Sequence, residues 1–453
     1  MLPHSFITSL QGLPGFDQEA FLKVHEQQEQ LTSIRFNQFK PFEVNAHPYF
    51  THLEPMHWCG NGYYLNQRPL FVLDPLWHAG AYYVQEASSM FLQYILEQIT
   101  PHPQPMKVLD LCAAPGGKTT LLANYYSNGL VVANETIKAR NAILVENLTK
   151  WGADNIVVTQ NDPAHFKAVP DFFDVLMIDA PCSGSGLFRK DPDAVEHWSE
   201  QSVQHCSTRQ TRIVEDSIDC LKEGGYLIYS TCSYSKEEDE KRLDHIASMG
   251  GMKNIQFELP VNWNIISTYS EEHHCQGFRF YPDKVKGEGF FIAVFQKEIS
   301  KSSGFYDTHA TSIPASKKEI ALLNSYFSVP ENYQLINHQN NLIALPHLFE
   351  SELNGLINHL YIKKMGLTIG EIKGSDLIPA HALAMSTWAH LPYASMEIDE
   401  ATALQYLRRA DLHLPNGKGW QALTYQKIRL GWAKLLPNRS NNYYPNEWRI
   451  LNY

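Results

Sequence analysis

Two of the seven cysteines lie where a reactive thiol would be useful. Cys182 stands in the segment DAPCSGSG and Cys232 in the segment STCS, and each follows an apolar run that predicts a buried strand. A thiol becomes nucleophilic when its pKa is lowered. Cysteine is also a common small buried residue, and that interpretation suits Cys206 and Cys220, which lie in helical patterns. The positions of Cys182 and Cys232 therefore favour covalent chemistry at one of them or at both.

A turn rich in glycine and proline precedes both cysteines. Residues 108–120 read VLDLCAAPGGKTT, a predicted strand that runs through the turn into a helix. Glycine lets a ligand approach the backbone, and a helix N-terminus offers free N–H groups to a carboxylate. A phosphate-binding P-loop would need glycine where the chain has Cys112, and the G-x-G-x-x-G fingerprint is absent. The turn therefore indicates a nucleotide-like ligand of another kind than the triphosphate of a P-loop hydrolase.

Acidic residues end three successive predicted strands: Glu135, Asp162 and Asp179. Ligands of open α/β sheets lie outside the carboxyl ends of the strands. Glu135 follows Asp110 by 25 residues, the range expected for a carboxylate that accepts hydrogen bonds from a ribose, and Asp162 could accept one from an exocyclic amine. Each acid alone is more often a turn or helix-capping residue. Together the three favour a nucleoside-shaped cofactor.

Alternating strand and helix patterns position these residues. Apolar runs at 106–113, 129–135, 155–162, 173–181, 224–233 and 287–297 predict strands, and helical patterns lie between them. This alternation predicts βαβ units, and hence an α/β fold with a mostly parallel sheet. Before residue 100, the chain combines a strand-and-turn pattern at 33–41 with an amphipathic helix whose stripe includes Met90, Tyr94 and Ile95.

One reaction would use all of these groups: methylation of carbon 5 of a cytosine. That carbon is a poor nucleophile, but a thiolate that adds to carbon 6 creates an enamine-like species able to attack a methyl sulfonium. An acid near ring nitrogen 3, where we expect Asp179, would stabilise the adduct. A second thiol would assist when the carbon-5 proton leaves and the first thiol is expelled. On this reasoning either Cys182 or Cys232 can be the nucleophile.

The chain resembles the RNA cytosine-5 methyltransferases of the Sun (Fmu-like) group, and within it the bacterial RsmF-type ribosomal RNA enzymes. The matching segments are LDLCAAPGGKT, ANE, ND, DAPCSGSG, FRKDP and STCS, with SIRFN and YVQEASSM before them and NNYYPNEWRI at the end. The resemblance implies a Rossmann-like methyltransferase domain at 101–298, an N-terminal α+β RNA-binding extension at 1–100, and a C-terminal region at 318–453 with a PUA-like, β-rich RNA-binding module. Residues 299–317, rich in Ser and Thr, predict a linker.

The resemblance implies S-adenosyl-L-methionine as the cofactor. The loop that would hold its methionine end comprises Cys112, Ala113, Ala114, Pro115, Gly116, Gly117 and Lys118. Glu135 would bind the ribose and Asp162 would lie at the adenine. Asp179 would contact both the cofactor and the target cytosine.

The resemblance also implies a different role for each of the two thiols. Cys232 would be the nucleophile and Cys182 would assist product release. Similar DNA enzymes use the cysteine of a Pro-Cys motif instead, and Pro181-Cys182 offers that alternative here. Pro181 and Lys190 are expected near the substrate or the cofactor.

Composition narrows the class of protein. The 453-residue chain has no apolar run of 18 residues and begins without a secretory signal, so we expect no membrane span and no secretion. Free thiols fit a reducing cytoplasm, and we expect a cytoplasmic protein. We also expect a monomer. An odd number of cysteines and the lack of C-x-x-C argue against a disulfide framework or a metal site. The HHC cluster at 273–275 lacks a second ligand pair, and we expect no metal.

The C-terminal tail favours RNA as the partner. The net charge of −11 argues against nucleic acid, but binding depends on local patches. Residues 408–453 hold eight basic and two acidic side chains, a local charge of +6, among aromatic residues at 420, 432, 443, 444 and 448. A solvated basic face with aromatic core packing would have the same composition. With the resemblance, the expected substrate is 16S rRNA of the small ribosomal subunit; a tRNA substrate and a non-catalytic assembly or RNA-binding factor are the alternatives.

Overall fold

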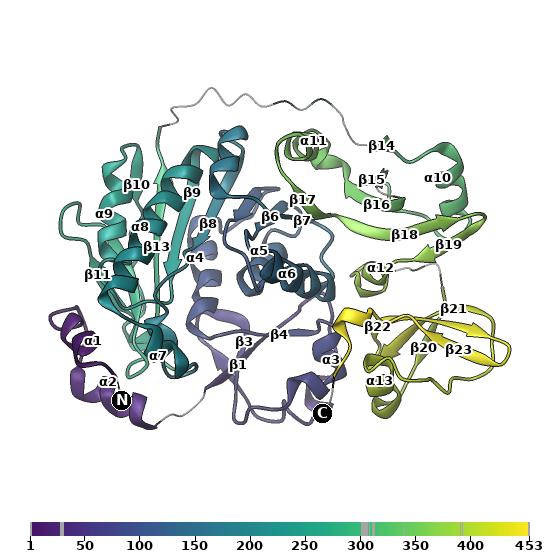
Figure 1. Ribbon diagram of the computed structural model, residues 1–453, viewed down its shortest axis with the longest axis horizontal. Helices are drawn as coiled ribbons and strands as arrows, with labels where there is room; N and C mark the ends of the chain where they lie inside the picture. The colour runs from purple at the N-terminus through teal and green to yellow at the C-terminus, as the bar shows by residue number, and fades with distance from the viewer. Residues whose placement is uncertain are drawn as a thin grey trace.

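The computed structural model describes residues 2–27, 31–299, 307, 309, 313–338, 340–389, 391 and 393–451. Most of the predicted linker at 299–317 therefore lies outside the described residues. Four sheets organise the described ranges (Figure 1). None of the helices described is long and apolar enough to cross a membrane.

The N-terminal extension combines short helices with an antiparallel sheet of order β2-β3-β1-β4. Its elements are α1 (His4–Ser9), α2 (Gln18–Gln27), β1 (Thr32–Phe36), β2 (Leu53–Met56), β3 (Cys59–Leu65), α3 (Pro75–His78) and β4 (Tyr82–Val84). The predicted amphipathic helix follows as α4 (Leu92–Ile99), and Met90 and Ile95 of its stripe have no exposed surface. These elements confirm the predicted α+β character of the extension.

The second sheet has the order β11-β12-β13-β9-β8-β5-β6-β7-β17, and β10 pairs with β13. Its strands are β5 (Lys107–Asp110), β6 (Leu130–Asn134), β7 (Ile156–Thr159), β8 (Phe173–Asp179), β9 (Leu221–Thr231), β10 (Met252–Asn254), β11 (Ile266–Tyr269), β12 (Gln276–Phe280), β13 (Phe290–Lys297) and β17 (Ile362–Met365). Strands β7, β6, β5, β8 and β9 are parallel neighbours, which confirms the predicted parallel sheet at its centre. On both sides of this centre the sheet continues with antiparallel strands.

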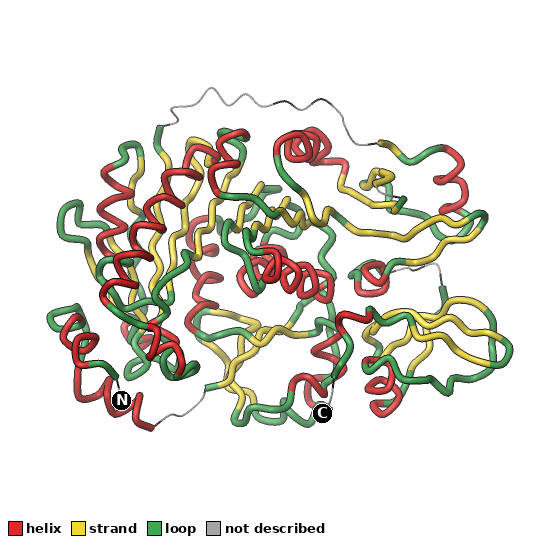
Figure 2. The backbone as a smooth tube through the Cα atoms, viewed as in Figure 1, coloured by secondary structure: helices red, strands yellow, loops and turns green. Residues whose placement is uncertain are grey.

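Helices cover both faces of this sheet (Figure 2). One face packs on α4, α5 (Gly117–Tyr125) and α6 (Lys138–Trp151). The other packs on α8 (Glu200–Ser217), α9 (Glu240–Ser248) and α11 (Glu350–His359), and the short α7 (Asp193–His197) precedes α8. Consecutive residues of β5, Val108 and Leu109, enter the two different cores. A parallel strand covered on both faces has this pattern, which explains why the strands read as continuous apolar runs.

The C-terminal region forms two further sheets, as its predicted β-rich character requires. The first contains β14 (Ile313–Pro314), β15 (Tyr333–His338), β16 (Asn341–Pro346), β18 (Leu367–Lys373) and β19 (Asp376–Pro379), with α10 (Lys317–Asn324) and α12 (His381–Met385) nearby. The second contains β20 (Ser395–Glu397), β21 (Gly419–Tyr425), β22 (Ile428–Leu436) and β23 (Arg439–Asn442), with α13 (Glu400–Leu407). Strand β17 of this region instead pairs with β7 of the large sheet.

The N-terminal sheet and the last sheet share one hydrophobic core. Ile34 and Tyr82 of the extension belong to the same buried cluster as Tyr406 and Leu423 of the C-terminal region. All four are at most 1% exposed. The first and last parts of the chain therefore pack directly against each other (Figure 1).

Arg35 joins the N-terminal sheet to the helix after the glycine-rich turn. Its buried guanidinium donates to Gln85 Oε1 at 3.0 Å, to the Gly117 carbonyl at 3.1 Å and to the Thr120 hydroxyl at 2.5 Å. It also lies 4.8 Å from the centre of the Trp151 ring. Burial lowers the pKa of Arg35 to about 10, so the side chain keeps its charge at neutral pH. Arg35 thus fixes the first turn of α5 against the extension.

We expect Arg35→Lys to lower the free energy of unfolding by about 2–4 kcal/mol, because an ammonium cannot reproduce the planar fork that reaches all three acceptors. Urea denaturation followed by tryptophan fluorescence measures the loss. Arg68→Lys, at an exposed arginine, is the matched control and should change stability by less than about 0.5 kcal/mol. Equal losses in the two variants would contradict the role given to Arg35.

Candidate active site

The glycine-rich turn lies between β5 and α5, as the sequence predicts. Gly116 has a φ of +113°, a left-handed conformation that favours glycine. Side chains of α6 hold the carbonyl groups of the turn: Arg140 Nη2 donates to Ala114 at 2.9 Å, and Asn147 Nδ2 donates to Pro115 at 2.8 Å. The turn is therefore fixed by the helix beside it.

A pocket of about 250 Å³ opens beside this turn. The predicted site residues that line it are Cys112, Ala113, Ala114, Pro115, Gly117, Lys118, Asp179, Lys190 and Cys232. The predicted residues Gly116, Pro181 and Cys182 are not among those that line it. Residues without a predicted role complete the wall: Tyr83, Val84, Gln85, Glu86, Ser89, Asp110, Leu187, Gly289 and Phe290. The resemblance places the segment YVQEASSM in the RNA-binding extension, and nothing in its sequence indicates a place in this pocket wall.

An ion pair forms part of the pocket wall. Lys118 Nζ lies 2.8 Å from Asp179 Oδ2, and the Ser230 hydroxyl donates to Asp179 Oδ1 at 2.6 Å. Burial alone would lower the pKa of Lys118, but the Asp179 carboxylate outweighs it and raises that pKa. Lys118 therefore remains a cation beside the pocket that Cys232 also lines.

Asp110 ends β5 in the same wall and is fully buried. Its Oδ2 accepts a hydrogen bond from the Thr119 hydroxyl at 2.6 Å, while Oδ1 has no hydrogen-bond partner among the described residues. Burial raises the pKa of Asp110 to about 7. A buried acceptor of this kind suits a ligand that brings its own donor.

Cys182 and Cys232 meet beyond the ends of β8 and β9. The parallel register pairs Asp179 with Ser230, and the two Sγ atoms lie 2.8 Å apart. The hydrogen bond to Cys232, together with burial, raises the pKa of Cys182 well above its usual range. Cys182 therefore stays a thiol and can donate to Cys232, which is the one of the pair that lines the pocket.

The other two predicted acids lie at the same edge of the sheet, outside the pocket lining. Glu135 follows β6 and is 4% exposed, with Oε2 3.3 Å from Arg140 Nη1. Asp162 follows β7, accepts from the Ala164 N–H at 3.1 Å and lies 2.5 Å from Arg212 Nη2. The contacts of these acids with a ribose and an adenine remain predictions.

Of the other five cysteines, Cys112 is partly buried in the pocket wall, and the remaining four are buried. Burial raises the pKa of Cys206, of Cys220 and of Cys275, which agrees with the structural interpretation of the first two. Within the described ranges, no three His, Cys, Asp or Glu side chains are grouped so that they could hold a metal ion.

The aromatic residues of the tail divide into core and surface. Trp420, Trp432 and Tyr444 are at most 9% exposed, so core packing accounts for them. Tyr443 is 40% exposed and lines a groove of about 800 Å³. The charged residues of this groove are Arg408, Arg409, Asp411 and Arg449.

Three regions of the chain match families of known proteins. Residues 97–296 match 16S rRNA methyltransferase RsmB/F, and residues 2–87 match the N-terminal domain of 16S rRNA methyltransferase RsmF. Residues 393–450 match the methyltransferase RsmF PUA domain. These matches confirm the Rossmann-like methyltransferase domain, the N-terminal extension and the PUA-like module as parts of the fold.

Individual relatives match over longer stretches. The chain is 31% identical over 471 residues to ribosomal RNA small subunit methyltransferase F of Vibrio cholerae, covering 98% of this chain and 97% of the relative. Among solved structures, a methyltransferase homolog protein from Pyrococcus horikoshii is 27% identical with a TM-score of 0.52, covering 65% of this chain and 100% of that one. NSun6 from Pyrococcus horikoshii with SFG shares the fold, at 19% identity, a TM-score of 0.54 and coverage of 66% and 98%. On the match over nearly its full length, the chain belongs to the RsmF family of 16S rRNA methyltransferases.

Proposed function

We propose that this methyltransferase transfers a methyl group from S-adenosyl-L-methionine to carbon 5 of a cytosine in 16S rRNA, through a covalent bond between Cys232 and carbon 6. The observation that carries the proposal is the position of Cys232, which lines the pocket with Lys118 and Asp179 and lies 2.8 Å from Cys182. We further propose a cytoplasmic monomer with domains at 1–100, 101–298 and 318–453.

The pocket residues fit the proposed cofactor. The methionine end of S-adenosyl-L-methionine carries an ammonium group, and Asp110 Oδ1 is an unpaired buried acceptor in the pocket wall. The first turn of α5 can receive its carboxylate. The loop 112–118 would hold this end, with Glu135 toward the ribose and Asp162 toward the adenine. When bound, the cofactor supplies an electrophilic methyl group.

Cys232 would begin the reaction as a thiolate. A hydrogen bond from the Cys182 thiol and the nearby Lys118 cation both stabilise that charge. Addition of the sulfur to carbon 6 makes carbon 5 nucleophilic. Asp179, held between Lys118 and Ser230, would accept a hydrogen bond from the exocyclic amine of the ring, and one from N3 when that nitrogen is protonated in the adduct.

Product release would then need Cys182. The carbon-5 proton must pass to a base, for which solvent water serves, its electron pair must re-form the double bond between carbons 5 and 6, and the bond from carbon 6 to sulfur must break with its electron pair left on Cys232. Cys182 stays protonated and lies 2.8 Å from the departing sulfur, so it can return a proton to Cys232. A proton from the same water restores the Cys182 thiol once it has protonated Cys232. The geometry thus supports different tasks for the two thiols, with the nucleophile in the pocket wall.

We expect Cys232→Ala to lower the rate of methyl transfer about 1,000-fold or more, because the covalent route is lost. Cys182→Ala should instead accumulate a covalent protein–RNA complex that survives a denaturing gel. Transfer of labelled methyl groups to 16S rRNA and the gel shift measure the two effects. Cys206→Ala, at a buried cysteine outside the pocket, is the control and should resemble the wild type. An active Cys232→Ala variant beside an inactive, untrapped Cys182→Ala variant would reverse the assignment.

Cofactor affinity should weaken as the pH falls through 7. The ammonium of the ligand pairs with ionised Asp110, whose pKa is about 7, so protonation removes the contact. Calorimetry with S-adenosylhomocysteine should show about tenfold weaker binding at pH 6 than at pH 8. Asp110→Asn should bind weakly at both pH values, whereas Asp376→Asn, at an exposed aspartate, should keep the wild-type dependence. An unchanged pH dependence in Asp110→Asn would exclude this role.

Deletion of the gene should remove one 5-methylcytosine from 16S rRNA and none from tRNA. The expectation follows from the family membership and from the need for an unpaired or flipped base, which folded rRNA can offer in its loops. Bisulfite sequencing of both RNA classes measures the result, with complementation by the wild-type and Cys232→Ala chains as controls. Loss of a tRNA mark alone would favour the tRNA alternative.

A further inference from the structure

The buried carboxylate of Glu238 joins the two loops that carry the thiols. Glu238 has no exposed surface and lies between β9 and α9. Its Oε1 accepts from the Ser183 N–H at 2.8 Å and from Gln210 Nε2 at 3.1 Å. Its Oε2 accepts from the Ser183 hydroxyl at 2.5 Å and from the Ser233 hydroxyl at 2.6 Å. Ser183 and Ser233 directly follow Cys182 and Cys232, so one carboxylate spans both loops.

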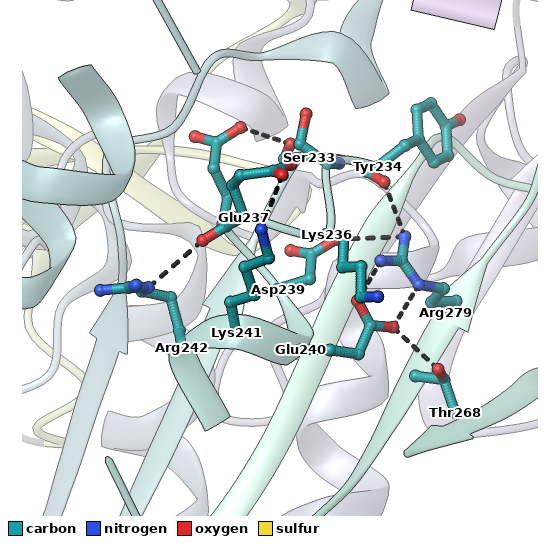
Figure 3. Close-up of polar contacts among 12 residues, drawn as sticks. Ser233, Tyr234, Lys236, Glu237, Asp239, Glu240, Lys241, Arg242, Thr268 and Arg279 are labelled. Carbon is teal, nitrogen blue, oxygen red and sulfur yellow. Dashed lines mark hydrogen bonds and ion pairs between the residues drawn. The ribbon is translucent and has the colours of Figure 1, made fainter. Parts of the chain in front are cut away.

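The loop of Cys232 has a second, independent anchor. Arg279 Nη1 donates to the Tyr234 carbonyl at 3.0 Å, and its guanidinium pairs with Asp239 at 3.2 Å and with Glu240 at 2.5 Å (Figure 3). Asp239 in turn accepts from the Thr231 hydroxyl at 2.6 Å. This buried ion cluster therefore holds the backbone on both sides of Cys232 without help from Glu238.

The loop of Cys182 is tied at its two ends to the segment of Cys232: the Ala180 N–H donates to the Ser230 carbonyl and the Gly186 N–H donates to the Cys232 carbonyl, both at 2.8 Å. Residues 180–184 form neither helix nor strand. Ser183 makes two hydrogen bonds to Glu238 at 2.8 and 2.5 Å and a longer one, at 3.4 Å, between its hydroxyl and that of Ser233. Gln210, which donates to the Pro181 carbonyl at 3.1 Å, donates to Glu238 as well. Between these two ends the shortest side-chain contacts of the loop are those with Glu238, whereas the segment of Cys232 also has the Arg279 cluster. A displacement of the Glu238 carboxylate would therefore move Cys182 more than Cys232.

We propose that Glu238 is a positioning residue that holds the Cys182 thiol at Cys232 for product release. It does not line the pocket, so it acts through the thiols and not on the substrate. The inference rests on the proposed function, because it needs Cys232 as nucleophile and Cys182 in release. The proposal adds one point to that function: the length of the Glu238 side chain, and not its negative charge, determines how fast the product is released from Cys232.

Two conservative substitutions separate reach from charge. Glu238→Asp keeps the charge but withdraws the carboxylate by about 1.5 Å, so it cannot reach both serines without moving the Cys182 loop. Glu238→Gln keeps the length, and its amide oxygen and NH₂ group can still bond the Ser183 N–H and the serine hydroxyl oxygens. A positioning role predicts that Asp is the more harmful residue, whereas a role for the negative charge predicts that Gln is.

We expect Glu238→Asp to lower kcat about 10- to 100-fold, the effect of a misplacement of this size, with the KM for S-adenosylmethionine changed less than about twofold. The covalent protein–RNA complex should accumulate in this variant as in Cys182→Ala, and Glu238→Gln should be less impaired. Steady-state methyl transfer and denaturing gels measure both. Glu237→Asp and Glu237→Gln are the matched controls, because that carboxylate pairs at 3.1 Å with Lys241 at the surface, and they should resemble the wild type.

Ser183 supplies a second test if Glu238→Asp does not fold. Ser183→Ala removes one hydroxyl donor and should accumulate the complex, while Ser183→Thr keeps the donor and should not. The inference is overturned if Glu238→Gln is more impaired than Glu238→Asp, or if Cys182→Ala traps RNA and neither Glu238→Asp nor Ser183→Ala does. If Cys182→Ala itself traps nothing, the release step of the proposed function fails instead, and the order of the two Glu238 variants still decides whether reach or charge matters.

Discussion

Parallel strands end at one edge of a sheet, and this constraint brings the residues of the candidate site together. Strands β5, β8 and β9 are neighbours, so Asp110, Asp179 and Cys232 line one pocket although they lie far apart in the chain. Because Asp179 of β8 pairs with Ser230 of β9, the chain leaves the two strands side by side and leads directly to Cys182 and Cys232. A slip of one residue would turn the side chains of a strand to the other face and separate these groups. The proposed chemistry therefore depends on the register of one strand pair.

The pocket is completed by a part of the chain that lies outside the catalytic sheet. Tyr83 to Glu86 line it from the N-terminal extension, and Arg35 ties that extension to α5. The extension in turn shares a hydrophobic core with the last sheet. The two parts proposed to bind RNA thus meet in one core on the same body as the pocket, and bound RNA would be held at a set place relative to Cys232.

Local patterns predicted the parallel strands, the glycine-rich turn and the two thiols, because apolar runs and strand-end residues report directly on their surroundings. The direction of β13 and the pairing of β17 with β7 could not be predicted, since an apolar run does not reveal its neighbour. The place of Asp110 in the pocket wall was not predicted, because a sequence does not reveal that one oxygen of a buried carboxylate has no hydrogen-bond partner. The choice of Cys232 over Cys182 came from resemblance, and the geometry now adds a physical reason for it: Cys232 lines the pocket and Cys182 does not.

Strand β17 also sets an order of events during synthesis. The catalytic sheet through β13 is complete once residue 297 has been made, but the strand that covers β7 ends at residue 365. At about 5–20 residues per second, the outer edge of β7 would wait roughly 3 to 14 s for its partner. An uncovered strand edge can pair with another chain. During this interval the open edge of β7 could therefore pair with a strand of another copy that is being made on the same polysome. The C-terminal region thus covers an edge of the methyltransferase sheet that the catalytic domain alone would leave open.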